Sequence, residues 1–174
     1  SISFENVSFT YPGNQQRAVE QVSFTVPQGK TYALVGSSGG GKTTLASLVP
    51  RFWDVNEGSV KIGGIDVRAF QEKDLMAKVA FVFQNTKLFK TSLCNNICAA
   101  KPTASRQEAL YAAHMAQCDD ILEKMPQGID TIVGTDGVYL SGGEQQRIAL
   151  ARAILKDAPI IILDEATAFA DPEN

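Results

Sequence analysis

The sequence predicts an α/β domain built on a mostly parallel sheet, with an antiparallel β portion at its N-terminal end. Three short apolar runs, at residues 31–36, 79–83 and 160–165, show the continuous hydrophobicity of strands buried on both faces. Helical patterns separate these runs, and this alternation is typical of parallel sheets covered by helices. The length of 174 residues fits one domain.

The antiparallel portion is predicted from residues 1–26. Apolar and polar residues alternate over residues 1–11, with one slip at Glu5 and Asn6 that indicates a β-bulge. A Pro-Gly turn follows, and the alternation resumes over residues 22–26. We therefore expect two antiparallel strands before the first buried strand.

Two helices between the apolar runs are predicted from their start and stop signals. One begins at about Lys42 and is disturbed at Pro50, which lacks an N–H group and crowds the preceding turn. The pattern Ser-x-x-Glu at residues 105–108 is a capping box. It opens an alanine-rich helix that is expected to run to about Cys118.

Charge and cysteine content exclude several classes of function. The net charge is −3 with both signs interspersed, so the chain lacks the basic surface that nucleic-acid binders use. No apolar run approaches the roughly 18–20 residues that cross a bilayer, and no signal peptide is recognised. Cys94, Cys98 and Cys118 lack disulfide spacing and indicate a reducing compartment. The first two would share a helix face, which allows metal binding, but free buried thiols are the preferred interpretation.

A glycine-rich segment at residues 36–43, GSSGGGKT, predicts a phosphate-binding loop and not an ordinary turn. It matches G-x-x-x-x-G-K-[ST] and lies between a predicted strand and a predicted helix. Its glycines let N–H groups surround phosphate oxygens, and the helix N-terminus adds a positive dipole end. Lys42 is expected to contact the β- and γ-phosphates, and the Thr43 hydroxyl to bind Mg²⁺. The expected nucleotide-binding residues here are Gly36, Ser37, Ser38, Gly39, Gly40, Gly41, Lys42, Thr43 and Thr44.

Asp164 and Glu165 end the third apolar run. Open α/β sheets bind ligands at the C-terminal ends of their strands. We therefore expect Asp164 to hold Mg²⁺ through water, and Glu165 to take a proton from the attacking water as a general base. An apolar run that ends in Asp-Glu usually marks only a strand end, so this prediction depends on the phosphate loop.

Two adjacent glycines, Gly142 and Gly143, stand in the first turn of a third predicted helix. Ser141 and Glu144 form a capping box around them, and the helix is expected to end at Asp157. A helical glycine costs about 1 kcal/mol relative to alanine, and capping does not explain it. Bare backbone at this place suits an anion that approaches the N–H groups closely. With two anion sites but one Asp-Glu pair, either the chain binds two ligands or its second site completes another copy's first site.

The order of these motifs resembles that of the nucleotide-binding domain of ATP-binding cassette (ABC) transporters. Residues 36–43 resemble Walker A, residues 140–147 (LSGGEQQR) the ABC signature, and residues 160–166 (IIILDEA) Walker B. The resemblance covers essentially the whole chain, and it implies a P-loop NTPase fold with a RecA-like core and a helical subdomain at about residues 86–156. It also implies two domains paired head-to-tail, each Mg-ATP lying between one Walker A and the partner's signature. ATP-driven dimerisation would then power transport.

The resemblance assigns roles to three further residues. Tyr11 falls where the family stacks an aromatic ring on adenine, although a tyrosine that ends a strand also serves packing. Gln84 matches the glutamine that contacts Mg²⁺ and the attacking water, and with Lys42 and Glu165 it would be catalytic. Asp171 matches the aspartate of the D-loop, which also belongs to the nucleotide site.

The resemblance also implies partners and a location. Residues 88–97 and 125–134 resemble exporter-type members, in which a six-helix membrane segment precedes the domain in the same chain. The expected partners are therefore a transmembrane domain and a second nucleotide-binding domain, in a homo- or heterodimer at the cytoplasmic face of a membrane. Nucleic acid is not an expected partner.

Several positions depart from the family pattern. Thr135 stands where exporter-type members usually carry a glutamate that faces the membrane domain, and Glu144 replaces a commoner glutamine. Residues 168–171 (AFAD) differ from the usual D-loop except at Asp171. The family's switch histidine, expected on a later strand, does not occur. We therefore expect a domain truncated after the D-loop, with deficient hydrolysis as a fragment.

Two other functions fit parts of the sequence. One is a soluble ABC-type ATPase that acts on ribosomes or DNA, but the stretch between Gln84 and Ser141 is too short for a coiled-coil arm and no basic patch occurs. The other is a degenerate domain that binds ATP as a regulatory clamp. The intact Lys42, Gln84, Asp164 and Glu165 argue against it.

Overall fold

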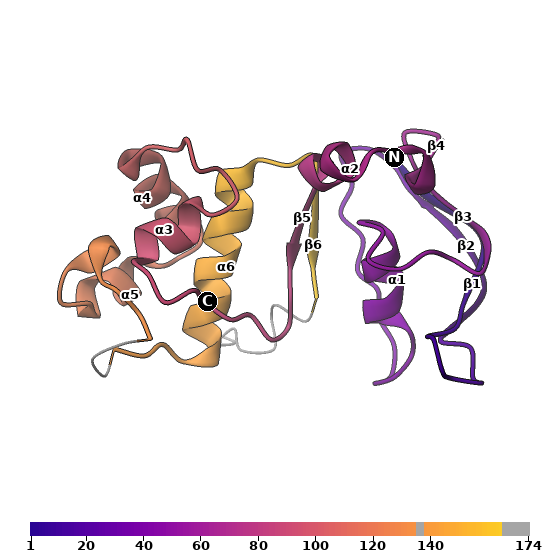
Figure 1. Ribbon diagram of the computed structural model, residues 1–174, viewed down its shortest axis with the longest axis horizontal. Coiled ribbons are helices and arrows are strands. Elements are labelled where there is room, and N and C mark those ends of the chain that lie inside the picture. Colours follow the sequence, from indigo (N-terminus) through magenta and orange to yellow (C-terminus); the bar gives the residue numbers. More distant parts are fainter. Residues whose placement is uncertain (135–137, 165–174) are drawn as a thin grey trace. The chain divides into compact units, whose positions relative to one another are not determined.

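The computed structural model of the chain divides into two compact units, Ser1–Val79 and Ala80–Asn174, and each is described by itself. The structure describes residues 1–134 and 138–164. The N-terminal unit carries a four-stranded sheet, and the C-terminal unit carries a two-stranded sheet and a group of helices (Figure 1). No helix of the described residues is both long and apolar enough to cross a membrane.

The four-stranded sheet of the N-terminal unit is antiparallel throughout, with the strand order β2-β1-β3-β4. The predicted bulge in the first strand is confirmed, because the register shifts between Phe4 and Val7 and Asn6 adopts a φ of 47°. The alternation predicted the core face correctly, since Phe4, Val7 and Phe9 are buried. The strands are β1 (Ile2–Phe9), β2 (Val19–Val26), β3 (Glu57–Ile62) and β4 (Ile65–Asp66).

Two α-helices and one short 3₁₀ helix complete this unit. The first, α1 (Lys42–Leu48), begins at the predicted residue and ends two residues before Pro50, as the missing N–H group of proline requires. The others are the 3₁₀ helix Val67–Ala69 and α2 (Glu72–Lys78). Apolar side chains from these helices, among them Leu48 and Leu75, belong to the buried core.

The prediction of a strand at residues 31–36 is wrong. The segment forms neither strand nor helix, and its residues are exposed, with Val35 at 92% exposure. A strand in a parallel sheet is held by hydrogen bonds to its neighbours, and none of the described strands pairs with this segment. Its apolar sequence alone therefore does not make it a strand. The expectation of a mostly parallel sheet also fails in the described residues, where four strands are antiparallel and two are parallel.

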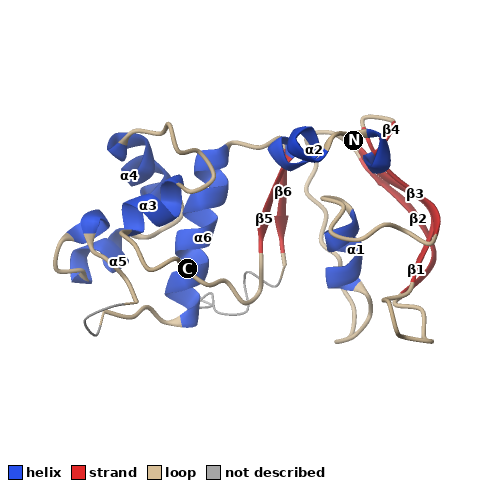
Figure 2. Cartoon of the chain, in the orientation of Figure 1, coloured by secondary structure: helices blue, strands red, loops and turns tan. Residues whose placement is uncertain are grey.

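The parallel pair lies in the C-terminal part of the chain (Figure 2). It consists of β5 (Val79–Val82) and β6 (Ile160–Leu163). Ala80 and Val82 of β5 are buried in one cluster with Ala149 and Ala153 of the long helix α6 (Gly142–Lys156). Because all four side chains are small, α6 approaches β5 closely. The expectation that β6 is buried on both faces is wrong, since two of its four residues are exposed.

The helices of the C-terminal unit share a second core. Leu93, Ile97, Ile121 and Ile148 are fully buried in it. The capping box predicted at Ser105 is confirmed, but its helix ends at Met115 and not at about Cys118, because Gln117 adopts a left-handed φ of 57°. The helices around α6 are α3 (Leu93–Cys98), α4 (Arg106–Met115) and α5 (Asp119–Lys124), with the 3₁₀ helix Gly128–Asp130.

The three cysteines lie in or against this core. Cys118 is buried as expected, and burial raises the pKa of its thiol to about 12. Cys94 and Cys98 are only half-buried, which corrects the expectation of buried thiols. Burial and then the neighbouring Cys94 raise the pKa of the Cys98 thiol. The raised pKa values keep Cys98 and Cys118 protonated and weakly nucleophilic at neutral pH.

Candidate functional site

The predicted phosphate loop is a tight turn that leads into α1. The Gly40 N–H donates to the Ser37 carbonyl at 3.1 Å, and Gly39 and Gly41 adopt left-handed φ angles of 77° and 79°. A Cβ atom at Gly41 would lie 2.5 Å from the Ala18 carbonyl oxygen. The backbone of the loop therefore requires glycine at residue 41, for its φ angle and for its close approach to a neighbouring strand.

Lys42 is the first residue of α1, and its side chain reaches back over the loop. Its Nζ atom donates to the carbonyl oxygens of Gly36 at 3.0 Å and Ser37 at 2.8 Å. Both acceptors are neutral, so the positive charge remains available to an anion. The lysine is thus already directed at the turn where phosphate groups were predicted, which fits a nucleotide.

The other predicted residues of this unit lie beside the loop. The Tyr11 hydroxyl lies 2.9 Å from the Thr44 hydroxyl, and its ring packs edge-on against Trp53 with the centroids 5.3 Å apart. Thr43 accepts a 2.7 Å hydrogen bond at its carbonyl from the Ser47 hydroxyl. Tyr11 therefore contributes to packing beside α1, and its stacking on adenine stays a prediction.

In the C-terminal unit, Gln84 and Asp164 follow neighbouring strands. The Asp164 N–H donates to the Val82 carbonyl at 3.0 Å, and the Asp164 side chain is buried. Gln84 follows β5 and is exposed. Because parallel strands end at the same edge of their sheet, the structure brings Gln84 and Asp164 to one edge. The phosphate loop belongs to the other unit, Ser1–Val79.

The N-terminus of α6 carries the second glycine pair. The Ser141 hydroxyl accepts from the Glu144 N–H at 3.3 Å, and the Glu144 carboxylate accepts from the Ser141 N–H at 2.8 Å. The predicted capping box is confirmed. Gly142 and Gly143 lie within the helix, and a Cβ atom at Gly142 would meet no atom within 4 Å. The helix itself therefore gives no reason for glycine at residue 142.

Some predicted residues lie outside the part of the chain that the structure describes. These are the expected general base Glu165 and the D-loop residue Asp171, together with Thr135. Their roles stay predictions. Among the described residues, no three His, Cys, Asp or Glu side chains form a group that could hold a metal ion.

Two buried side-chain amides of the C-terminal unit were missed from the sequence. Gln146 of α6 donates from Nε2 to the Gln84 carbonyl at 3.0 Å. Asn96 of α3 bonds both main-chain groups of Phe89, at 2.8 and 3.0 Å, and its carbonyl accepts from Arg152 at 2.7 Å. A polar residue in a predicted helix is usually expected on the solvent-exposed face, so the burial of these two side chains was not predicted. The available signal for Gln146 was its position, since it shares a helix face with the alanines three and seven residues later.

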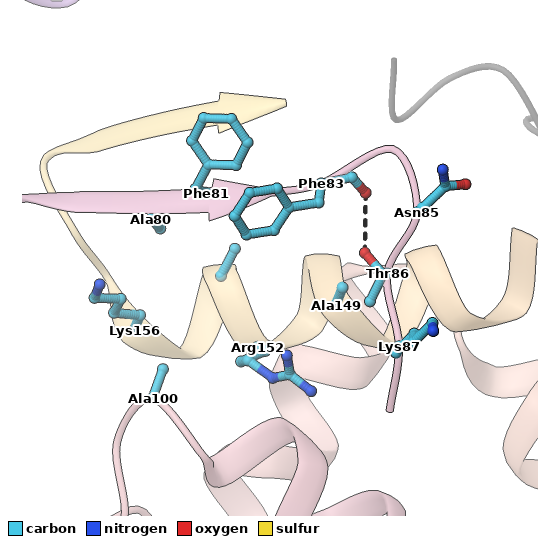
Figure 3. Close-up of a pocket in the computed structure, with 11 residues that line it drawn as sticks. Ala80, Phe81, Phe83, Asn85, Thr86, Lys87, Ala100, Ala149, Arg152 and Lys156 are labelled. Carbon is cyan, nitrogen blue, oxygen red and sulfur yellow. Dashed lines mark hydrogen bonds between the residues drawn. The ribbon is translucent and has the colours of Figure 1, made fainter. Parts of the chain in front are cut away.

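A pocket of about 330 Å³ lies between β5, the segment that follows it and α6 (Figure 3). Phe81 and Phe83 form its aromatic part, and Arg152 and Lys156 bring positive charge. Burial lowers the pKa of both cationic side chains. Thr86 also lines the pocket, and its hydroxyl donates to the Phe83 carbonyl at 2.9 Å. All of the residues that line this pocket belong to the C-terminal unit.

Sequence comparisons agree with the motif assignment. A family model described as ABC transporter matches residues 19–168, which include the phosphate loop and the α6 N-terminus. The ATP-dependent lipid A-core flippase of Haemophilus ducreyi is 47% identical over 174 residues. The protein of the same name from Escherichia coli (strain K12) is 48% identical over the same length. Each alignment covers 99% of this chain and 30% of the relative.

A solved structure extends the likeness to the fold. The structure of a bacterial Atm1-family ABC exporter with ATP bound superposes with a TM-score of 0.92 at 40% sequence identity. The superposition covers 99% of this chain and 30% of that chain. The chain thus spans about a third of the length of the relatives it matches.

Proposed function

The chain belongs to the ABC transporter family as an ATP-binding domain, and on this premise we propose that it binds and hydrolyses Mg-ATP to power transport across a membrane. The observation that carries the proposal is the phosphate loop. Lys42 points back into the turn, and its two acceptors there are neutral carbonyls. Phosphate oxygens can replace these acceptors with a gain in charge pairing.

The magnesium ligands are part of the same proposal. We assign them to the Thr43 hydroxyl, Gln84 and, through water, Asp164. Mg²⁺ is usually held by one or two carboxylates together with phosphates and waters, and not by an all-protein cage. On this proposal the ion would enter together with the nucleotide. When bound, Mg²⁺ would neutralise charge on the phosphates.

The remaining roles follow the motif positions. Glu165 would accept a proton from the attacking water, and Gln84, at the exposed end of β5, would orient that water. Tyr11 would stack on the adenine, and Asp171 would complete the nucleotide site.

We further propose a head-to-tail pair of domains in which the Ser141–Glu144 capping box, with Gly142 and Gly143, serves the ATP of the partner. The open space at Gly142 supports this proposal, because a group from outside the chain can approach the helix N-terminus there. The segment at about residues 86–156 would be the helical subdomain that carries this contact. A transmembrane domain in the same full-length protein would hold the pair at the cytoplasmic face of a membrane.

A measurement of ATP hydrolysis distinguishes the proposed function from that of a regulatory clamp that only binds ATP. Glu165→Gln in the full-length protein should slow ATP turnover by roughly 10²-fold or more, because a general base is lost. ATP affinity should stay within about twofold, since the side chain keeps its size. Phosphate release and equilibrium binding measure the two effects. Turnover at the wild-type rate would show that the base lies elsewhere, and a wild-type protein that binds ATP without hydrolysis would favour the clamp.

A further inference from the structure

Gln146 joins helix α6 to the segment that follows β5. It lies five residues after Ser141, is only 4% exposed, and donates from Nε2 to the carbonyl oxygen of Gln84, which is 62 residues away in sequence. A main-chain carbonyl can only accept a hydrogen bond. The amide nitrogen of Gln146 must therefore face Gln84, which determines the orientation of the whole amide.

This orientation leaves the other end of the amide without a donor. Within the described part of the chain, the Gln146 Oε1 atom is buried and has no hydrogen-bond partner. Buried acceptors without partners are rare in proteins because each one costs stability. A side chain that only filled space here would be apolar, as Ala149 and Ala153 on the same face are. The amide is therefore kept for its bond to Gln84 and not for packing.

The surroundings make this bond a rigid link. Ala149 and Ala153 hold α6 closely against Ala80 and Val82 of β5. On the other side of the helix, the Arg147 guanidinium pairs with both carboxylate oxygens of Asp120 in α5, at 2.8 and 3.0 Å. The first turns of α6 are thus fixed to the helical core, and Gln146 fixes the Gln84 backbone to them.

We propose that Gln146 is a positioning residue that couples Gln84, in this chain's own nucleotide site, to the α6 N-terminus that this chain presents to its partner. The inference rests on the proposed function. A displacement of Gln84 on nucleotide binding is transmitted through the carbonyl and the Gln146 amide to α6. Ser141 and Gly142 begin that helix, so they move with it.

Gln146→Met in the full-length protein tests this role, because methionine keeps the length of the side chain and removes both polar atoms. We expect the turnover number for ATP to fall about 10- to 100-fold, the effect of a small misplacement at a reacting centre. The KM for ATP should stay within about twofold. The Tm should be unchanged or higher, because the unpartnered oxygen is removed and water can bond the carbonyl of the exposed Gln84.

Asn96→Leu is the matched contrast, since Asn96 is also a buried amide but has partners at both ends. It should lower the Tm by about 4 °C or more, as expected when main-chain groups lose buried partners. A comparable loss of Tm in Gln146→Met would mean that Gln146 is merely structural and would overturn the proposal.

A double variant tests whether Gln146 acts through Gln84. Once Gln84→Ala has removed the side chain to be positioned, adding Gln146→Met should change turnover by no more than about twofold. A further tenfold loss, or wild-type turnover in Gln146→Met alone, would overturn the inference and leave the proposed function intact. A wild-type protein that neither binds nor hydrolyses ATP would overturn both.

Discussion

Glycines stand at the N-termini of both α1 and α6, and the two sets of glycines meet different needs. At α1, Gly41 has a φ of 79°, and a Cβ atom there would lie 2.5 Å from the Ala18 carbonyl oxygen. At α6, Gly142 is helical, and a Cβ atom there would meet nothing within 4 Å. The fold requires the first glycine and has space for a side chain at the second.

This difference separates structural from functional evidence. Gly41 would stay glycine even if the loop bound nothing, so its identity alone is weak evidence for a nucleotide. Gly142 weakens its own helix and serves no contact among the described residues. A glycine of this second kind leaves room for a group that approaches from outside the chain, as the proposed function requires. The α6 N-terminus is therefore the more informative of the two, although the α1 loop has the more familiar motif.

The largest expected effect is that of Gly41→Ala, which tests the structural requirement at α1. The substitution should lower the free energy of unfolding by about 3 kcal/mol or more. Alanine disfavours the left-handed φ, and its Cβ atom would force the backbone at Ala18, just before β2, to move. Nucleotide binding should be lost together with stability. Thermal denaturation and ATP binding of the full-length protein measure both effects, and an unchanged Tm would contradict the requirement.

Lys42→Ala is the control for this prediction. The two hydrogen bonds of its ammonium are exposed, so the Tm should change little. ATP binding should nearly disappear, because the side chain supplies the full charge that faces the phosphates. Binding at the wild-type affinity would remove the phosphate-loop interpretation.

The next effect tests whether the α6 glycines serve the opposite subunit. In a mixed dimer of full-length subunits, one carries Lys42→Ala and the other Gly143→Asp, which places a carboxylate against phosphate. Like charges at a desolvated contact cost several kcal/mol. If the pair is head-to-tail, both lesions fall in one composite site and the other site still traps a nucleotide. We expect one trapped nucleotide per purified dimer, whereas none would contradict the head-to-tail arrangement.

Gly142→Ala is expected to have two smaller effects of opposite sign, a gain in stability and a loss of ATP turnover. Alanine should stabilise the helix by up to about 1 kcal/mol, because it fits the open space and restricts the unfolded chain. ATP turnover should fall about tenfold if a phosphate approaches the backbone at this residue. Higher stability with full turnover would show that no ligand comes close to Gly142, and the contrast with Gly41 would lose its functional meaning.

The smallest effects are expected from substitutions in the two capping boxes, at α4 and α6. Ser105→Ala at α4 and Ser141→Ala at α6 should each cost about 1 kcal/mol of unfolding free energy. Only Ser141→Ala should also slow hydrolysis. The α4 box has its own pH dependence, because Lys101 and then Ser105 lower the pKa of Glu108 from 4.5 to about 2. Its contribution is present above about pH 4.5 and is lost as the pH falls towards 2. Equal hydrolysis in both variants would place Ser141 outside the nucleotide site.

Features whose partners lie a few residues apart could be predicted from the amino-acid sequence. The capping boxes at Ser105 and Ser141, the bulge near Asn6 and the end of α1 before Pro50 were all predicted correctly. Each depends on hydrogen bonds or steric limits within about one turn of backbone, so the local sequence contains all the groups involved. The family motifs were recognised for the same reason, since each occupies a short contiguous segment.

Features that need distant partners could not be predicted and became visible in the folded chain. Residues 31–36 carry a short apolar run, as β5 does. However, β5 pairs with β6 and packs on α6, whereas the earlier segment pairs with no described strand. The bond from Gln146 to the Gln84 carbonyl joins residues 62 positions apart, and nothing local to either residue indicates it. Strand pairing and the burial of a polar side chain depend on which surfaces the folded chain brings together, and no short segment contains that information.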